Sequence, residues 1–214
     1  MPDVTAPGPG APGPGTPGPG TPDFGAEATR RRLTQRQAGT VAKLTSAAME
    51  EVRATGYAGL TVRNVAARAR VGTATAYMYF SSKEHLVAEV YWRTLRALPP
   101  VPAASPDDDR PAAERVAAVI REIVMVAAAE PDLAAAATVS LLGSSPDVHD
   151  LRLRVGLTIR ERLVAALGDG YDPAVLTALE YASSGAMLQA GMGFTSYEEA
   201  ADRLADTTRL VLRD

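Results

Sequence analysis

The segment VGTATAYMYFSSKEHL, residues 71–86, gathers hydroxyl, phenol and ammonium groups that can donate hydrogen bonds. If it forms a short helix, Ala76 and Phe80 lie four residues apart on one face and can pack into a core. Thr75 and Tyr77 then project elsewhere. Such groups donate to phosphate oxygens, and threonine methyl groups contact the thymine methyl in a major groove. The pattern therefore predicts a helix with one buried wall and one wall that contacts nucleic acid.

Charge is divided unevenly along the chain. Residues 29–98 carry 12 Lys/Arg and four Glu, a net charge of +8, whereas residues 99–214 have a net charge of −8 and residues 1–28 of −3. A basic segment joined to an acidic one indicates that the first meets a polyanion. A helical interaction module without DNA binding would leave the basic segment unexplained. The arginines within 30–36 form either a solvated helix lead-in or a basic arm that reaches nucleic acid.

The remaining reactive residues form no catalytic or metal-binding pattern. The 214 residues include no cysteine, and His85 and His149 lie far apart without a carboxylate or thiol cluster. The phosphate-binding motif G-x-x-x-x-G-K-[ST] and the metalloprotease motif H-E-x-x-H are absent from the sequence. We therefore expect no enzyme activity, no metal site and no cofactor.

Apolar residues recur at helical spacing, and no run alternates with a period of two, so the predicted fold class is all-α. Thr61, Ser82 and Ser196 are predicted N-caps, and Gly56 a C-cap. We expect about nine helices, over residues 35–56, from 61 onward, 73–80, 82–98, 111–129, 132–143, 147–168, 173–192 and 197–212.

The chain divides by composition into four parts. Residues 1–28 hold a Pro/Gly-rich repeat that predicts a disordered tail, and residues 99–110 form a Pro/Asp-rich linker. Between them, 29–98 would be the nucleic-acid-binding domain, and 111–214 a second helical domain. No apolar run is long enough for a membrane span and no secretion signal is evident, so we expect a cytoplasmic protein without a membrane partner.

The stretch TVRNVAARARVGTATAYMYFSSKEHL, residues 61–86, resembles the DNA-binding domain of tetracycline-repressor (TetR) family transcription regulators, and the resemblance extends over about 35–98. It implies an N-terminal three-helix helix-turn-helix domain followed by a C-terminal helical bundle. Two positions depart from the family pattern. Arg70 stands where a turn glycine is usual, and a left-handed backbone there would cost about 1 kcal/mol or more. Gly72 replaces the usual Ser/Thr cap.

The resemblance also implies which residues contact double-stranded operator DNA. The second helix would begin against the phosphate backbone, the third would approach base edges, and a tyrosine and a lysine would hold phosphate. The residues expected in these roles are Thr61, Val62, Arg63, Thr73, Thr75, Tyr77, Tyr79 and Lys83. The implied function is a homodimeric repressor that binds a palindromic operator and is released by a small, mostly apolar effector. A regulator without an effector, or an activator, is the alternative.

The second half offers weaker support for a dimer. Small side chains in LEYASSGAMLQAGMGF, residues 179–194, allow close helix packing, and two such helices from each subunit would build a four-helix interface. Packing within one subunit is the alternative. The expected interface residues are Ala182, Gly185, Ala186, Leu204, Thr208 and Val211.

An effector pocket is the least specific prediction. Apolar residues with a few polar neighbours in the second half could line a cavity, although each of them alone is more typical of an ordinary core. The expected lining residues are Met125, Leu141, Tyr181, Met187, Gln189, Met192 and Phe194.

Overall fold

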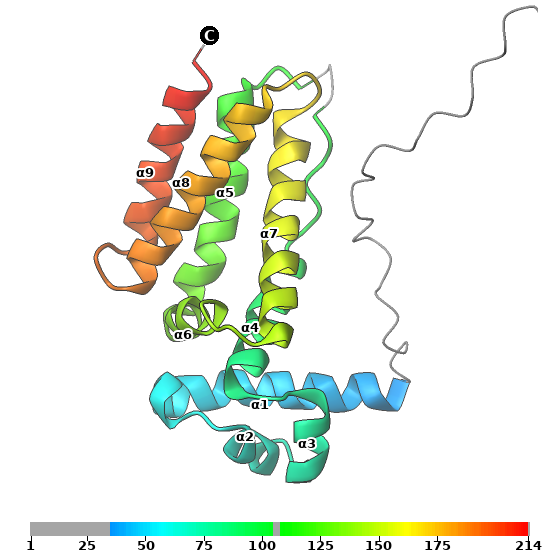
Figure 1. Cartoon of the computed structure of the whole chain (residues 1–214). Coiled ribbons are helices and arrows are strands. Elements are labelled where there is room, and N and C mark those ends of the chain that lie inside the picture. The colour runs from blue at the N-terminus through cyan, green and yellow to red at the C-terminus, as the bar shows by residue number, and fades with distance from the viewer. Residues whose placement is uncertain (1–34, 105–107, 214) are drawn as a thin grey trace, which may run out of the picture. The chain divides into compact units, whose positions relative to one another are not determined.

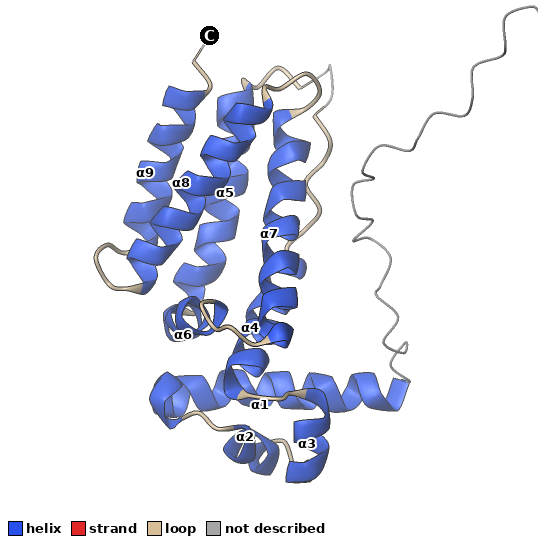
Figure 2. Cartoon of the chain, in the orientation of Figure 1, coloured by secondary structure: helices blue, strands red, loops and turns tan. Residues whose placement is uncertain are grey.

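A computed structural model describes residues 35–104 and 108–213, and within them every regular element is an α-helix (Figures 1 and 2). This confirms the all-α prediction; the predicted tail over 1–28 and Arg30–Arg32 lie outside the described residues. The helices are α1 Gln35–Gly59, α2 Val62–Arg68, α3 Thr73–Tyr79, α4 Lys83–Arg96, α5 Ala112–Ala129, α6 Pro131–Leu141, α7 Pro146–Leu167, α8 Pro173–Gly191 and α9 Tyr197–Val211.

Helices α1, α2 and α3 (residues 35–80, called the head below) pack around a small apolar core. Leu44 of α1, Val65 of α2 and Ala76 of α3 are completely buried. An ion pair reinforces the contact between the first two helices, because Arg68 donates to one carboxylate oxygen of buried Glu51 at 2.7 and 2.8 Å. These contacts hold the three helices of the head against one another.

The turn between α2 and α3 ends α2 in a Schellman arrangement. The Arg70 N–H donates to the Ala67 carbonyl at 3.1 Å, and the Val71 N–H donates to the Ala66 carbonyl at 2.9 Å. This geometry gives Arg70 a φ of +54°, which costs a residue with a Cβ about 1–2 kcal/mol. Arg70 thus adopts the left-handed conformation although it is not a glycine. Gly72 then caps α3 without a side-chain hydrogen bond.

Local sequence signals set where the other helices begin. The hydroxyls of Thr61, Ser82 and Ser196 accept hydrogen bonds from backbone N–H groups three residues on, at 3.0, 3.1 and 3.0 Å. Each side chain thus satisfies a donor that the first turn of a helix leaves unpaired, as predicted. Gly56 has a φ of +66° and interrupts the helical conformation near the end of α1.

Helices α5 to α9 form the bundle in the upper part of Figure 1, and α4 leads from the head into it. Helix α4 packs against α6 and α7, while α5 lies along α9. Helices α6 and α8 approach so closely at Gly191 that a Cβ there would stand 2.9 Å from the Thr138 Cβ. Among the described residues, no single helix has the length and hydropathy of a membrane span, and α5 with α6 reaches them only as a pair bent by 103°.

Candidate nucleic-acid interface and effector cavity

Helix α3 has one wall in the core and one wall in solvent. Ala76 and Phe80 are buried, whereas Thr73 and Thr75 are exposed. Tyr77 is 50% exposed and Met78 is 84% exposed. Because hydroxyl, phenol and thioether groups share an outward wall, α3 presents a mixed polar and apolar surface of the kind that contacts base edges and phosphates.

Helix α2 begins beside this wall, and only some of the side chains at its start are exposed there. Thr61 and Arg63 are exposed, but the Val62 side chain is buried in the head core. The expectation for Val62 is therefore corrected: only its backbone remains available to a phosphate. Tyr79 is half-buried and packs against the core, so its side chain is divided between the core and solvent.

Lys83, at the start of α4, is already held by the end of α1. Its ammonium donates to the Tyr57 carbonyl at 3.2 Å and lies 4.2 Å from the centre of the Tyr57 ring. The Tyr57 hydroxyl in turn donates to Glu84 at 2.9 Å. Lys83 therefore fixes α4 against α1, and an ammonium has a further donor to offer to a phosphate.

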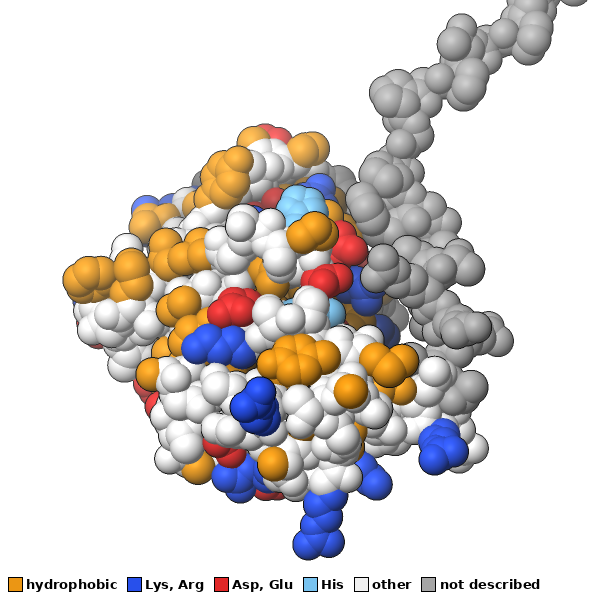
Figure 3. Space-filling model, turned by 60° about the horizontal axis from the view of Figure 1, so that its bottom comes forward, with side chains coloured by type: hydrophobic (Ala, Val, Ile, Leu, Met, Phe, Trp, Pro, Cys, Tyr) orange, Lys and Arg blue, Asp and Glu red, His pale blue; other side chains and the backbone are white. Residues whose placement is uncertain are grey.

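Basic side chains without a counter-ion lie on the head. Arg63 and Arg70 are exposed and form no ion pair with any described residue, whereas Arg68 is neutralised by Glu51. Figure 3 turns this end of the molecule forward and shows blue basic side chains spread over it. Unpaired arginines next to an exposed α3 favour a polyanionic partner.

The bundle encloses an apolar cavity of about 580 Å³ between α4, α5, α6, α7 and α8. Leu141 and Met187, two of the predicted lining residues, are among its walls. Sequence reasoning missed most of the others, because they come from five helices and share no motif. They include Tyr91, Ile120, Ile123, Val124, Thr138, Val155, Ile159, Ser183 and Leu188.

The other five predicted pocket residues lie outside this cavity, which corrects the prediction for them. Tyr181 is 75% exposed and Phe194 is 76% exposed, and the side chains of Met125, Gln189 and Met192 also face solvent. Helix α8 carries large side chains on more than one face, so hydrophobicity alone did not show which of them point inward.

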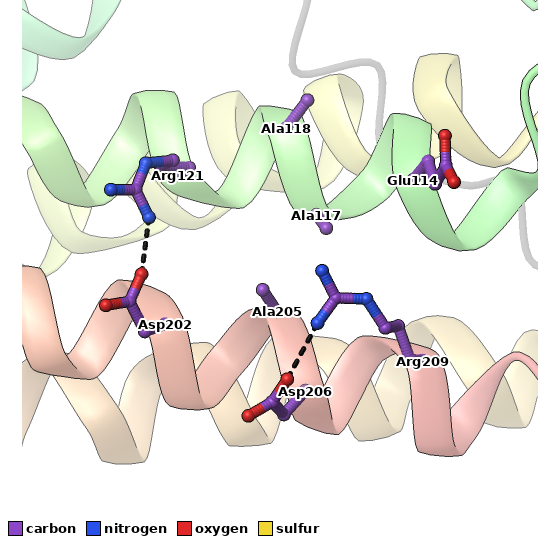
Figure 4. Close-up of a pocket in the computed structure, with 8 residues that line it drawn as sticks. All are labelled: Glu114, Ala117, Ala118, Arg121, Asp202, Ala205, Asp206 and Arg209. Atoms are coloured by element: carbon purple, nitrogen blue, oxygen red, sulfur yellow. Dashed lines mark hydrogen bonds and ion pairs between the residues drawn. The ribbon is translucent and has the colours of Figure 1, made fainter.

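A second hollow lies on the outer surface of the bundle, between α5 and α9 (Figure 4). Alanines form its floor, and charged side chains flank it. Arg121 pairs with Asp202 at 2.6 Å and Arg209 with Asp206 at 2.7 Å. Both arginines are neutralised by carboxylates of the same chain, so this hollow offers a ligand fewer unpaired groups than the apolar cavity does.

The predicted interface residues of α8 and α9 fall into two groups, one buried within the subunit and one at least partly exposed. Leu204 and Thr208 are buried within the subunit, and the Thr208 hydroxyl donates to the Leu204 carbonyl at 2.8 Å. These two belong to the core, which corrects the prediction. Gly185 is exposed on α8. The remaining three, Ala182, Ala186 and Val211, are half-buried.

No group of three or more His, Cys, Asp or Glu residues within the described ranges is arranged to hold a metal ion.

Comparison with known proteins identifies a family and relatives to which this chain is similar. A sequence model of the family described as bacterial regulatory proteins, tetR family, matches residues 44–90. Over 189 residues the chain is 46% identical to an uncharacterised HTH-type (helix-turn-helix) transcriptional regulator of Mycobacterium bovis, a match that covers 87% of this chain and 86% of the relative. A regulator of the same description from Mycobacterium tuberculosis matches to the same extent.

Solved structures show the same helical arrangement. A TetR transcriptional regulator from Rhodococcus sp. RHA1 is similar with a TM-score of 0.69 at 22% identity, over 84% of this chain and 98% of that one. The regulator FadR from Bacillus subtilis, in complex with stearoyl-CoA, is similar with a TM-score of 0.54 at 18% identity, over 80% and 97%. At these identities the likeness concerns the fold.

Proposed function

The chain belongs to the tetR family of bacterial regulatory proteins and is a transcriptional regulator, and from this premise we propose that it acts as a homodimeric repressor whose DNA binding is released by a small, mostly apolar effector. The head, within residues 29–98, binds operator DNA in the cytoplasm. Residues 111–214 bind the effector and form the dimer, and 99–110 link the two.

One observation carries the DNA-binding part: the outward wall of α3. Thr73, Thr75 and Tyr77 are exposed opposite buried Ala76 and Phe80, next to arginines without counter-ions. A short exposed helix held by a preceding capped helix is how a helix-turn-helix enters a major groove. Thr73 and Thr75 then approach base edges, while Thr61, Arg63, Tyr77 and Lys83 hold phosphates.

The outer side of α8 supports the homodimer. Tyr181 and Gly185 lie at exposed positions of this helix, and exposed Met192 and Phe194 follow it. Large exposed apolar side chains gathered on one element are typical of an interface. A two-fold axis through this surface would pair two heads for two half-sites of a palindromic operator.

The apolar cavity supports effector control. Its walls include α4 and α7, and both helices contact the end of the head. A molecule that binds more tightly to a conformation with wrongly spaced heads weakens DNA binding by that difference in affinity. The solved FadR structure holds stearoyl-CoA, which supports small-molecule binding by this fold.

The test is a DNA-binding titration with the gene's own upstream DNA at several salt concentrations. Wild-type protein should bind one fragment specifically, with affinity that falls steeply as salt rises. Tyr77→Ala should abolish specific binding and leave helix content and dimer size unchanged. Val139→Ala, at an exposed apolar position of α6, is the matched control and should bind as wild type does. Unchanged binding by Tyr77→Ala would contradict the assignment of α3.

A further inference from the structure

Two residues that line the cavity each carry a hydroxyl group without a hydrogen-bond partner among the described residues. Tyr91 of α4 lines the cavity, is only 6% exposed, and forms no hydrogen bond with any described residue. Ser183 of α8 also lines it, and its hydroxyl oxygen is buried without a hydrogen-bond partner. They come from helices far apart in the sequence, so two separate elements leave a donor unused at the same cavity.

Such groups are uncommon in folded proteins. Most buried polar atoms are hydrogen-bonded, and a buried donor without a partner costs about 1–3 kcal/mol. Burial raises the pKa of the Tyr91 phenol, and proximity to Tyr197 raises it further, so Tyr91 stays a neutral O–H donor. A bound molecule that supplies an acceptor oxygen removes this cost.

Among the charged residues at the cavity, Arg152 alone forms no ion pair with a described residue, and it is exposed to solvent. Arg160 and Glu180 form an ion pair at 2.9 Å, and Arg152 donates to the Gly143 carbonyl at 2.7 Å. The other lining residues are uncharged, and most of them are aliphatic. An anionic group placed at the two neutral hydroxyls would lose its water without gaining a charged partner from them, which is strongly unfavourable.

The rim of the cavity is apolar as well. Leu142, Leu153 and Leu188 line the cavity and are all exposed to solvent. An aliphatic chain can therefore contact leucine side chains from α6, α7 and α8 as it enters. Rim and interior thus favour the same kind of molecule, one with a long apolar body.

From these features we propose that the effector is an uncharged, mainly aliphatic molecule with a carbonyl oxygen, a ketone or an ester, that accepts hydrogen bonds from Tyr91 and Ser183. This assignment rests on the proposed effector function and names its ligand class. It predicts that an ester or ketone binds more tightly than a free fatty acid or a CoA thioester, because two neutral hydroxyls cannot neutralise a carboxylate or a phosphate.

Calorimetry on the full chain tests the ligand class directly. Methyl esters with chains of six to twelve carbons are titrated at pH 7.5, beside the matching carboxylates and octanoyl-CoA. At least one ester should bind, and its carboxylate should bind at least about tenfold more weakly. Tighter binding of a carboxylate or of octanoyl-CoA, or no binding by any ester, would overturn the proposal.

Variants locate the binding within the cavity. Tyr91→Phe and Ser183→Ala each remove one donor and should weaken ester binding by about twofold to tenfold, with melting temperatures at or above that of wild type. Thr177→Ala, which removes a hydroxyl from an exposed position of α8 outside the cavity, is the control and should bind the ester as wild type does. Equal ester affinity in wild type and in both donor variants would also overturn the proposal.

Failure of this inference is distinguishable from failure of the proposed function. DNA binding is measured separately, without any ester. If the protein binds its operator but no ester binds, the ligand class is wrong and the DNA-binding function stands. If an ester binds and no DNA fragment does, the ligand class stands and the DNA-binding function is wrong.

Discussion

Ser81, in the turn between α3 and α4, donates a 2.7 Å hydrogen bond to the carboxylate of Asp147 in the first turn of α7. His85 lies beside the same carboxylate, with its Nδ1 3.7 Å away. Because α7 also lines the cavity, this contact connects the wall of the cavity to the turn that follows the exposed α3. A displacement of α7 would reach the head through these side chains.

We expect Asp147→Ala to lower the free energy of unfolding by about 1 kcal/mol. The substitution removes the acceptor for Ser81 and also an acidic group that favours the N-terminus of α7. Asp147→Asn keeps an acceptor oxygen and should lose less. Urea unfolding of both variants measures the difference. An alanine variant as stable as wild type would show that the hydrogen bond contributes nothing to folding.

The stability of the protein should depend on pH through His85. Burial lowers the pKa of this imidazole below its ordinary value of 6.5, although nearby Asp147 and Glu89 act in the opposite direction. The unfolded chain therefore binds a proton more readily than the folded one. The stability contributed by neutral His85 is fully present above about pH 6.5 and is lost as pH falls through the folded-state pKa.

The measurement for His85 is a series of melting temperatures between pH 7.5 and 5.5. The decrease should be smaller for His85→Gln than for wild type, because the substituted side chain cannot take up a proton. His149→Gln, at an exposed position, is the control and should follow the wild-type curve. Parallel curves for wild type and His85→Gln would contradict the assignment.

Arg63 should contribute to the affinity for DNA in general without contributing to sequence specificity. Arg63→Ala removes one unpaired cation from the head, so affinity for all DNA should fall and the salt dependence should decrease by about one ion. Thr75→Ala, in contrast, should reduce the preference for the operator and leave the salt dependence unchanged. Arg203→Ala on α9, where the arginine pairs with Glu199, should change neither. Equal salt dependence in Arg63→Ala and wild type would rule out the phosphate contact.

The helices and the wall assignment of α3 could be predicted because their signals are local. A cap such as Thr61 or Ser82 acts on an N–H group three residues away, and a buried pair such as Ala76 and Phe80 follows from one helical turn. These interactions need no knowledge of the rest of the chain. The helical fold of the head could therefore be predicted, while its DNA contacts stay predictions and the side chain of Val62 is buried.

The cavity and the faces of α8 could not be predicted in this way. On this one helix Leu176 and Leu179 are buried whereas Tyr181 is exposed, so its sequence has no single apolar stripe. The choice of the inward face depends on neighbouring helices. Tyr91 reaches the same cavity from nearly a hundred residues earlier, and no pattern in the sequence connects the two segments.

Replacement of Arg70 should stabilise the head. Its φ of +54° is unfavourable for a residue with a Cβ, and glycine adopts it without strain. Arg70→Gly should therefore raise the free energy of unfolding by up to about 1 kcal/mol, after the greater freedom of glycine in the unfolded chain is counted. Arg70→Val should lower it, since a β-branched side chain tolerates this conformation poorly. Urea unfolding ranks the three proteins, and a valine variant as stable as the glycine variant would contradict the role of strain here.

Gly191 should tolerate no larger side chain. A Cβ at this position would stand 2.9 Å from the Thr138 Cβ and closer still to the Thr138 hydroxyl oxygen. Thr138 cannot easily turn away, because it is β-branched and its hydroxyl donates to the Ala134 carbonyl at 3.0 Å. Gly191→Ala should therefore destabilise the protein by about 1–3 kcal/mol, and Thr138→Ala in the same chain should recover part of the loss.

A matched glycine separates this clash from the effect of alanine on helices in general. Gly39 in α1 has open space around a Cβ, so Gly39→Ala should stabilise the protein by up to about 1 kcal/mol through helix propensity alone. Urea unfolding of the two single variants should therefore give changes of opposite sign. If Gly191→Ala were instead as stable as Gly39→Ala, helices α6 and α8 would have to lie farther apart at Thr138 than the structure places them.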